Sequence, residues 1–248
     1  MTYSIYFSPT GGTQRVMDIL AAGFDEDTQE LDLTVQPTKL ELTAADVCLV
    51  GVPSFGGRVP AAALERLDYL TGNGAKAVAV AVYGNRHYDD TLLELQHRLE
   101  NRGFTVVAGI AAVAEHSVVR QFGTGRPHAV DAQQLREFAV AIREKLEKEA
   151  EPVTLPGNVP YKEFGGAPFR PVAAEHCTKC GLCAAQCPVG AIPAEAPHTT
   201  NNEICFACLR CISVCPSKAR ALPDAVIRTM TEKLRHACET PKENLLFL

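Results

Sequence analysis

Apolar and polar residues alternate in blocks over the first part of the chain, which is typical of a sheet covered by helices. Continuous apolar runs at 47–52, 75–82 and 105–113 predict strands buried on both faces, and shorter runs at 3–7 and 28–33 predict two more. Apolar residues at helical spacing lie between these runs, at 14–24, at Leu92, Leu95 and Leu99, and at Leu135, Phe138, Ile142 and Leu146. The pattern predicts a doubly wound α/β domain of five parallel strands, with a ligand crevice at their carboxyl ends.

Length and composition allow one domain of this kind and a small second one. The chain has 248 residues, of which 46% are hydrophobic and 21% charged, and this excludes wholesale disorder. Its net charge of −5 argues against a nucleic-acid-binding surface. No apolar run reaches the ~20 residues of a spanning helix, and the N-terminus lacks a signal-peptide pattern. We therefore expect a cytoplasmic protein without a membrane span.

The pattern changes near residue 150. A segment with five prolines and three glycines follows and predicts a linker. Beyond the second domain, Pro223 and Asp224 predict the start of a C-terminal helix, which we expect to pack on the second domain or on the linker. The expected divisions are a first domain, the linker, a small α+β domain, and the helix with its tail, at 1–149, 150–171, 172–222 and 223–248.

The cysteines are concentrated in the second domain. Eight of the ten occur as two copies of the spacing C-x-x-C-x-x-C-x-x-x-C-P, offset by 28 residues. This is the bacterial ferredoxin spacing, in which three close thiolates hold three corners of a [4Fe–4S] cluster and the fourth cysteine ligates the other cluster. Zinc sites use two C-x-x-C pairs or add histidine, and disulfides suit an oxidising compartment, so both alternatives fit poorly. The predicted ligand sets are Cys177, Cys180, Cys183 and Cys215, and Cys205, Cys208, Cys211 and Cys187.

A loop rich in hydroxyls and glycines joins the first strand to the first helix. Its residues are Ser8, Pro9, Thr10, Gly11, Gly12 and Thr13. At a helix N-terminus, backbone N–H groups and hydroxyls donate hydrogen bonds to an anion and glycines allow close approach, so the loop predicts a phosphate site. The lysine of a nucleotide P-loop and the G-x-G-x-x-G of a dinucleotide site are both missing. The structural alternative is a tight turn with a Ser/Thr helix cap.

This loop resembles the phosphate loop of flavodoxins, and two further loops extend the resemblance. They follow the third and fourth strands and resemble the loops that flank the isoalloxazine ring of FMN. Their residues are Pro53, Ser54, Phe55, Gly56, Gly57 and Arg58, and Tyr83, Gly84, Asn85, Arg86, His87 and Tyr88. The resemblance implies a flavodoxin-like fold with strand order 2-1-3-4-5, and FMN as the cofactor.

The residue types of these two loops suit a flat redox ring. Phe55, Tyr83 or Tyr88 would stack on the ring, and Arg58 or Arg86 would stabilise its reduced, anionic form. The chain departs from the flavodoxin pattern because it has no tryptophan to stack there. Ordinary packing at the edge of the sheet is the alternative for each aromatic residue taken alone.

Three further residues have simpler expected roles. His116 lies in a polar loop after the fifth strand, and we expect a surface histidine without a role, in a loop that borders the flavin or the second domain. Cys48 lies inside an apolar run and is expected to be a small buried hydrophobe. Cys238 has no partner in the cysteine spacing and is expected to be a bystander.

Almost the whole chain resembles the fusion proteins of anaerobes that join a flavodoxin to a two-cluster ferredoxin. The resemblance implies an electron-transfer protein that carries FMN and two [4Fe–4S] clusters and serves redox partner proteins. The alternative is an iron–sulfur flavoenzyme that reduces a small substrate, with His87, Tyr88 or His116 as the proton donor. A sensory module is a third hypothesis, against which the intact flavin loops argue. The sequence assigns no catalytic residue and no oligomeric state.

Overall fold

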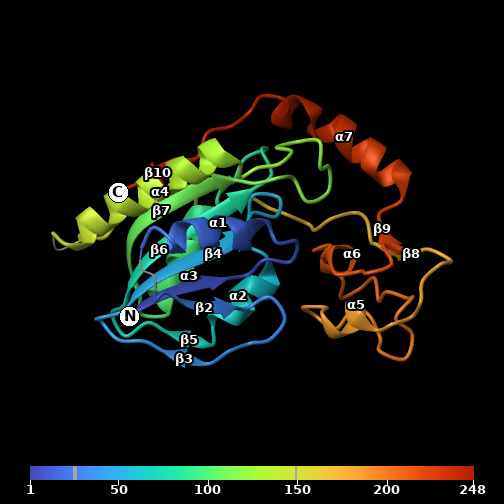
Figure 1. Ribbon diagram of the computed structural model, residues 1–248, viewed down its shortest axis with the longest axis horizontal. Helices are drawn as coiled ribbons and strands as arrows, with labels where there is room; N and C mark the ends of the chain where they lie inside the picture. The colour runs from blue at the N-terminus through green and yellow to red at the C-terminus, as the bar shows by residue number, and fades with distance from the viewer. Residues whose placement is uncertain (25–26, 149) are drawn as a thin grey trace.

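The computed structural model describes residues 1–24, 27–148 and 150–248. A sheet with strand order β10-β7-β6-β4-β1-β2 forms the centre of the first domain (Figure 1). Its parallel strands are β1 (Thr2–Tyr6), β2 (Gln29–Asp32), β4 (Val47–Pro53), β6 (Lys76–Tyr83) and β7 (Thr105–Val113). Counted along the chain, these five strands have the order 2-1-3-4-5, so the predicted flavodoxin-like fold is confirmed. A short separate ladder pairs β3 (Leu40–Glu41) with β5 (Leu70–Thr71).

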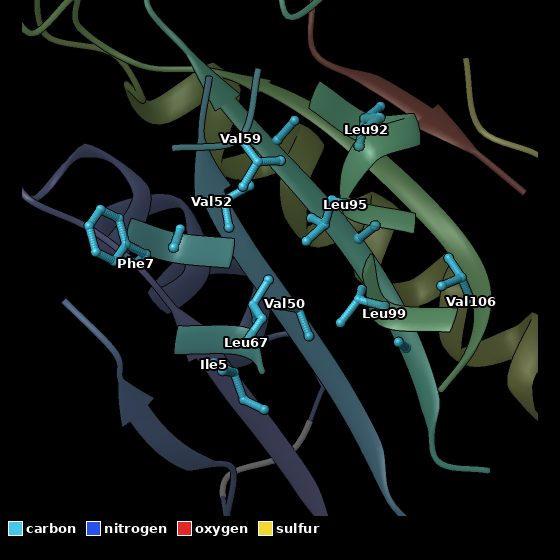
Figure 2. Close-up of a cluster of buried hydrophobic side chains, with 14 of the residues drawn as sticks. Ile5, Phe7, Val50, Val52, Val59, Leu67, Leu92, Leu95, Leu99 and Val106 are labelled. Carbon is cyan, nitrogen blue, oxygen red and sulfur yellow. The ribbon is translucent and has the colours of Figure 1, made fainter. Parts of the chain in front are cut away.

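Helices cover both faces of this sheet. Successive strand residues point to opposite faces, so Ile5 belongs to one core and Tyr6 to the other. Figure 2 shows the first core, where strand residues meet α2 (Ala61–Leu67) and α3 (Thr91–Asn101) through Leu67, Leu92, Leu95 and Leu99. The second core packs α1 (Gly12–Ala21) and α4 (Ala129–Leu146) against the sheet through Val16, Met17, Leu20, Leu135 and Ile142. Two buried faces explain why the central strands are continuously apolar.

Cys48 of β4 is part of the first core. Its side chain is 0% exposed, and burial raises the pKa of its thiol to about 12. The expectation of a small buried hydrophobe is confirmed.

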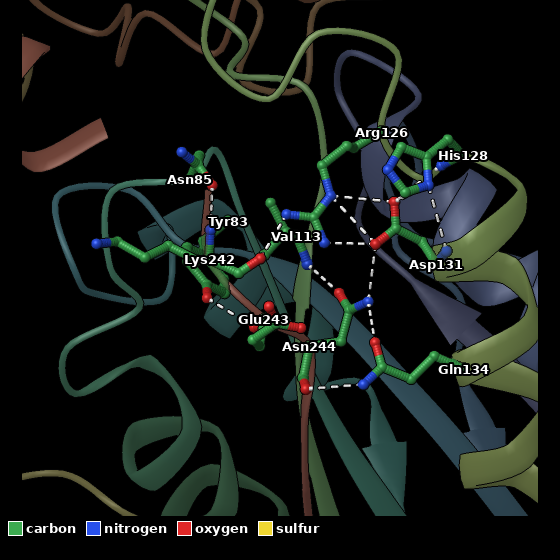
Figure 3. A network of polar contacts seen from close by, with 10 residues as sticks. All are labelled: Tyr83, Asn85, Val113, Arg126, His128, Asp131, Gln134, Lys242, Glu243 and Asn244. Carbon is green, nitrogen blue, oxygen red and sulfur yellow. Dashed lines mark hydrogen bonds and ion pairs between the residues drawn. The ribbon is translucent and has the colours of Figure 1, made fainter. Parts of the chain in front are cut away.

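The sheet has a sixth strand that the sequence pattern did not predict. β10 (Leu245–Phe247) comes from the C-terminal tail and pairs antiparallel with β7. Asn244, which is 3% exposed, precedes it and accepts a hydrogen bond from the Val113 backbone N–H at 2.8 Å. Its amide donates to Asp131 and Gln134 of α4, both at 2.9 Å (Figure 3). These contacts fix the tail to the edge of the first domain.

The linker lies against the first domain and does not hang free. Residue 149, the expected end of the first domain, lies outside the described residues. The Leu155 backbone N–H donates to Gln96 Oε1 of α3 at 2.8 Å, and the Leu155 side chain is buried in the first core. Further along, the Asp90 carboxylate accepts hydrogen bonds from the backbone N–H groups of Asn158 and Lys162. The proline-rich segment is therefore packed against the surface of the first domain.

The second domain repeats one short unit. Its elements are β8 (Val172–Ala173), α5 (Leu182–Ala185), α6 (Arg210–Ser213) and β9 (Arg220–Ala221), and β8 pairs antiparallel with β9. Positive φ recurs at equivalent places in the two cysteine copies: at 179 and 207, at 181 and 209, and at 190 and 218. Glycine takes this conformation at 181 and 190, whereas Leu209 and Lys218 take it in the second copy with a side chain. The repeat seen in the cysteine spacing is thus also a repeat of backbone conformation.

Helix α7 (Asp224–Cys238) connects the second domain to the first (Figure 1). Near its start, Val226 and Ile227 pack with Phe169 and Leu222 in one hydrophobic cluster. Near its end, Leu234 and Cys238 pack with Val119 and Phe122 of the first domain in another. The helix therefore packs on the second domain, as expected, and also on the first domain. No helix among the described residues is long and apolar enough to cross a membrane.

Candidate cofactor sites

The loop between β1 and α1 is built as a helix start. Gly11 has a φ of +83° and precedes α1, and the Ser8 hydroxyl accepts a hydrogen bond from the Gln14 backbone N–H at 2.9 Å. The Ser8 backbone N–H donates to Thr34 Oγ1 at 2.8 Å, and Ser8 and Thr13 are buried. The Ser8 hydroxyl thus caps the Gln14 N–H in the way that the structural alternative expects, although the N-cap residue itself is Gly11.

Thr10 and Gly12 face a cavity of about 500 Å³, which we call the phosphate-side cavity. Ser8, Gly11 and Thr13, which were also expected at a phosphate, do not line it. Its remaining lining includes basic side chains from three segments: Arg15, Arg120 and Lys218. Sequence analysis missed these residues, although Arg15 lies in the first turn of the helix that follows the glycines. The second domain supplies Lys218, so the cavity lies between the domains.

The two loops after β4 and β6 meet at a second cavity of about 380 Å³, which we call the ring-side cavity. The expected residues that line it are Ser54, Phe55, Gly56, Tyr83, Gly84, Arg86 and His87. Ser117 and Val118 line both cavities, so the two hollows adjoin. The structure thus brings residues of the three predicted loops to two adjoining cavities at the carboxyl ends of the strands.

Arg58 departs from the expected position beside the ring. Its guanidinium forms a bidentate ion pair with Glu94 of α3, at 2.6 and 2.9 Å, and it donates to the Lys162 carbonyl at 2.8 Å. The hydrogen bond to Glu94 raises the pKa of Arg58 above its usual value. The guanidinium also lies 4.9 Å from the centre of the Tyr161 ring. Arg58 therefore holds the linker, and its side chain does not line the ring-side cavity.

Asn85 is also engaged elsewhere. Its amide donates to the carbonyls of Cys238 and Thr240, at 2.6 and 3.1 Å, and its Oδ1 accepts from the Lys242 backbone N–H. Asn85 is buried and points to the C-terminal segment (Figure 3). The C-terminal tail, and not a ligand, provides the hydrogen-bond partners of the Asn85 side chain. The expectation that Cys238 is a bystander is therefore corrected: its carbonyl accepts from Asn85, and its buried thiol packs with Val119 and Phe122 and lies 4.0 Å from the Gly84 carbonyl.

The remaining residues that were expected at the ring do not line the cavity. Tyr88 is buried, stacks on His87 with ring centres 4.8 Å apart, and meets Tyr83 edge to face at 5.5 Å. A Cβ on Gly57 would lie 2.1 Å from Asp89 Oδ2, so glycine is needed there for packing. Pro53 ends β4 and does not line the cavity. Of the three aromatic side chains expected to stack, Phe55 and Tyr83 are the two that line the cavity.

His116 is part of the ring-side cavity, which corrects the expectation of a surface histidine without a role. Its Nδ1 accepts hydrogen bonds from the backbone N–H groups of Val118 and Val119, at 3.2 and 3.1 Å. Burial, with a smaller contribution from Arg86, lowers the pKa of His116 to about 4. The imidazole is therefore neutral near pH 7, with its proton on Nε2. It acts as a structural support of the loop on which α7 rests.

The eight cysteines of the repeat separate into two groups of four. Cys177, Cys180, Cys183 and Cys215, the first set, line one small cavity, and Cys187, Cys205, Cys208 and Cys211, the second set, line another. None of the ten cysteines, all of which are described, forms a disulfide. The grouping is the one that the sequence predicts for crossed ligation. That each set binds a cluster stays a prediction.

Backbone and side-chain donors surround the sulfur atoms. The Ala191 N–H donates to Cys187 Sγ and the equivalent Ala219 N–H donates to Cys215 Sγ, both at 3.2 Å. Burial opposes ionisation of Cys215, but the Ser217 hydroxyl and nearby backbone N–H groups hold its pKa below the usual value. Burial raises the pKa of Cys208 to about 12 and that of Cys211 to about 11. Such buried thiols ionise when a metal supplies positive charge.

Arg220 is a residue of this region that sequence analysis missed. It is 2% exposed, lines the cavity of the first set, and donates to the Thr200 hydroxyl and to the carbonyls of Pro197 and Thr199. The equivalent residue of the first copy is Ile192, which lines the cavity of the second set. A comparison of the two copies residue by residue would have shown this buried charge.

Phe206 lies between the two kinds of site. It lines the ring-side cavity and also the cavity of the second set. Its ring centre is 6.1 Å from that of Phe55 in the first domain, with the planes inclined at 38°. The second cysteine set and the predicted flavin ring site therefore share a wall.

Residues 167–221 match the family model of the 4Fe-4S dicluster domain. No curated protein matches the chain. The match covers the region that contains both cysteine sets, and it gives this part of the chain iron–sulfur chemistry and a redox role in electron transfer.

Solved flavodoxins resemble the first domain. The flavodoxin of Streptococcus pneumoniae TIGR4 is 18% identical, covers 58% of this chain and 98% of its own, and has a TM-score of 0.42. The two-electron reduced flavodoxin of Megasphaera elsdenii is 20% identical, covers 57% and 99%, and has a TM-score of 0.39. Flavodoxin 2 of Bacillus cereus is 15% identical, covers 58% and 98%, and has a TM-score of 0.42. The strand order, and not these scores, identifies the fold. The chain thus joins an α/β domain with the flavodoxin-like strand order to a region that matches the 4Fe-4S dicluster domain.

Proposed function

We propose that this chain is an electron-transfer protein that holds FMN in its first domain and two [4Fe–4S] clusters in its second, and that it serves redox partner proteins. When bound, each cluster takes up one electron and FMN takes up one or two. The position of Phe206, which lines both the ring-side cavity and the cavity of the second set, carries the proposal. Redox groups on either side of one side chain suit electron transfer within the molecule.

The crevice of the first domain fits a ligand with a phosphate and a flat ring. Thr10 and Gly12 offer donors at the start of α1, and Arg15 and Lys218 add positive charge. The adjoining ring-side cavity is lined by aromatic side chains and by polar and charged ones such as Arg86 and Lys162, which suits a flat ring with a polar edge. FMN has this make-up, whereas riboflavin lacks the phosphate.

The second domain fits two clusters because each set supplies four thiols around one small cavity. The backbone N–H groups of Ala191 and Ala219 donate to one sulfur in each set, a contact that tunes cluster potentials. A reducing, cytoplasmic compartment, which remains a prediction, would keep such thiols available for iron.

The alternative, a flavoenzyme that acts on a small substrate, needs a proton donor beside the ring. His87 and His116 both line the ring-side cavity, but each uses Nδ1 to accept a backbone hydrogen bond. The low pKa of His116, about 4 as a result of burial, leaves it uncharged near pH 7. The position of Phe206 between the ring-side cavity and the second set, and not these contacts, favours the carrier over the enzyme.

The test is anaerobic reconstitution followed by rapid mixing with a reduced ferredoxin-type donor. Two clusters correspond to about eight irons per chain, and we expect one FMN. Flavin reduction should follow cluster reduction at a rate that is independent of protein concentration. A flavin rate that rises with protein concentration would contradict transfer within the molecule, and a chain that binds no FMN would contradict the flavin site.

A further inference from the structure

The ring-side cavity has walls from both halves of the chain. The loops after β4 and β6 form one side, with Phe55 and Tyr83 as their aromatic residues. The other side comes from the linker, the second domain and α7, and includes Phe164, Phe169 and Phe206. The first domain by itself therefore supplies only part of the site. The chain also has no tryptophan with which the first domain could supply the missing wall.

Phe164 of the linker lies directly on the first-domain loop. A Cβ added to Gly56 would come within 2.2 Å of Phe164 Cδ2, so glycine at this position is what lets the ring approach. Phe164 is 44% exposed even in this position. Such an exposed aromatic ring at the rim of a cavity has room to bury a further surface against a ligand.

Phe206 closes the cavity from the second domain. Its ring faces Phe55 at 6.1 Å, and Phe206 also packs against the first core. In the first copy of the repeat the equivalent residue is Thr178. The aromatic side chain is thus present only in the copy that borders the ring-side cavity, which points to a role there and not in the cysteine spacing itself.

Hydrogen bonds to nearby backbone groups connect the linker and the second domain to the first domain. The Asp90 carboxylate and the Arg58 guanidinium fix the backbone of Lys162, two residues before Phe164 in the chain. Across the domains, Arg66 of α2 donates to the Pro188 carbonyl at 2.8 Å. The wall is therefore positioned before any ligand arrives, which reduces the entropic cost of binding.

We propose that Phe164 and Phe206 complete the ring site, so that the isoalloxazine ring contacts aromatic side chains from the linker and the second domain as well as from the flavodoxin-like domain. This inference rests on the proposed function. It has a consequence for energetics, because a ligand that contacts both halves stabilises their docking, and docking in turn raises the affinity for the ligand by the same factor.

The experiment measures flavin affinity of the full chain by the change in flavin fluorescence, with FMN and riboflavin as the probes. Phe164→Ala and Phe206→Ala should each weaken binding about tenfold or more. Both probes should be weakened by the same factor, since the lost contact is to the ring. Thr10→Val should instead weaken FMN and leave riboflavin unchanged.

Two controls separate ring contact from general damage. Tyr161→Ala removes a linker aromatic residue that stacks with Arg58 and does not line the cavity, and it should leave flavin affinity close to that of the parent chain. Phe206→Tyr keeps the aromatic ring next to Cys205 and should keep the affinity. Iron content and thermal unfolding of every variant show whether the second domain is intact.

The outcomes distinguish this inference from the proposed function. If the parent chain binds neither flavin, the proposed flavin site fails and the inference fails with it. If the parent chain binds FMN and the two alanine variants bind it equally well, the inference is wrong and the proposed function stands. If Tyr161→Ala weakens binding as much as Phe164→Ala, docking of the linker and not ring contact is responsible, which also overturns the inference.

Discussion

The two cysteine copies, 177–187 and 205–215, share a spacing and a backbone conformation but lie in different surroundings. Cys180 is exposed, whereas its counterpart Cys208 is buried. Leu182 is 40% exposed, whereas its counterpart Arg210 reaches the Pro9 carbonyl of the first domain. The middle of the second copy lies against the first domain, and the equivalent part of the first copy faces solvent. The cysteine spacing sets the predicted ligands, and the packing of the second domain on the first decides which copy contacts the first domain.

This asymmetry suggests a division of work. The exposed copy is accessible to partner proteins, and the buried copy borders the ring-side cavity through Phe206. Solvent exposure and hydrogen bonds to sulfur also influence cluster potentials, so the two sets should differ in potential. The following variants test whether the two copies differ in ligation, in contact with the first domain and in potential.

The largest effect should come from the crossed cysteines. Cys187→Ser should remove the cluster of the second set, and Cys215→Ser that of the first, so each variant loses about half of its iron and sulfide. Iron and sulfide analysis with electron paramagnetic resonance of the reduced protein measures the loss. Cys238→Ala, outside the repeat, should keep the full content. A Cys187→Ser protein that loses the cluster of Cys177, Cys180 and Cys183 would contradict crossed ligation.

Release of the C-terminal tail should make the buried copy behave more like the exposed one. Asn244→Ala leaves the Val113 N–H and part of the Asp131 carboxylate without their buried partner, at a cost of about 2 kcal/mol or more in unfolding free energy. Denaturant unfolding and limited proteolysis near Cys208 measure this. Gln133→Ala, at an exposed position of the same helix, should change neither. Equal protection of Cys208 in both variants would show that the tail does not maintain the docking.

Acid should destabilise the region around His116 before it affects the exposed first cysteine copy. The pKa of His116 is lowered by burial to about 4, so the unfolded chain takes up a proton near the ordinary value of 6.5 while the folded chain does not. Stability contributed by neutral His116 is therefore present above about pH 6.5 and is lost as the pH falls toward 4, with a slope of at most ~1.4 kcal/mol per pH unit.

Denaturant unfolding at several pH values measures this slope for the parent chain and for His116→Gln. The variant should lose the added pH dependence in this window. An unchanged slope in the variant would show that the imidazole does not titrate with folding.

A smaller effect should distinguish the two sets by their potentials. Arg220→Met removes a buried positive charge beside the first set, so reduction of that set becomes less favourable and its potential should fall by tens of millivolts, about 59 mV for each tenfold change in the equilibrium. The potential of the second set should move in the same direction but less, because the guanidinium partly offsets the burial that raises the pKa of Cys211 in that set, yet of the two cysteine cavities it lines only that of the first set. A redox titration followed by electron paramagnetic resonance resolves the two. Equal shifts in both sets would contradict a local effect of this guanidinium.

The smallest effect concerns one contact between the domains. Arg66→Met removes the hydrogen bond to the Pro188 carbonyl and should weaken docking by about 1 kcal/mol. Hydrogen exchange of backbone amides around the second copy measures docking. Arg98→Met, which breaks an exposed ion pair with Asp68 inside the first domain, is the matched control and should leave exchange unchanged. Faster exchange in the control than in Arg66→Met would assign the effect to the first domain alone.

Features that depend on nearby residues were predictable from the sequence, whereas contacts between distant segments were not. The central strands were predictable because burial on both faces leaves a continuous apolar run, and the cysteine groups followed from spacing along the chain. Arg58 was expected at the ring, but its partner Glu94 lies on a helix whose approach the local sequence does not show. Asn85 was expected at the ring for the same kind of reason, and the C-terminal tail engages it.

The sequence by itself determined the five parallel strands, the helices α1, α3, α4 and α7, the hydroxyl-rich and glycine-rich loops, and the repeat of cysteines. Each of these depends on residues close together in the chain, where covalent geometry and periodicity decide the result. Only the tertiary structure decided that β10 closes the sheet edge, that α7 connects the domains, and that Phe206 lies between the ring-side cavity and the second set. These features join segments more than a hundred residues apart, and which segments meet depends on the packing of the whole chain.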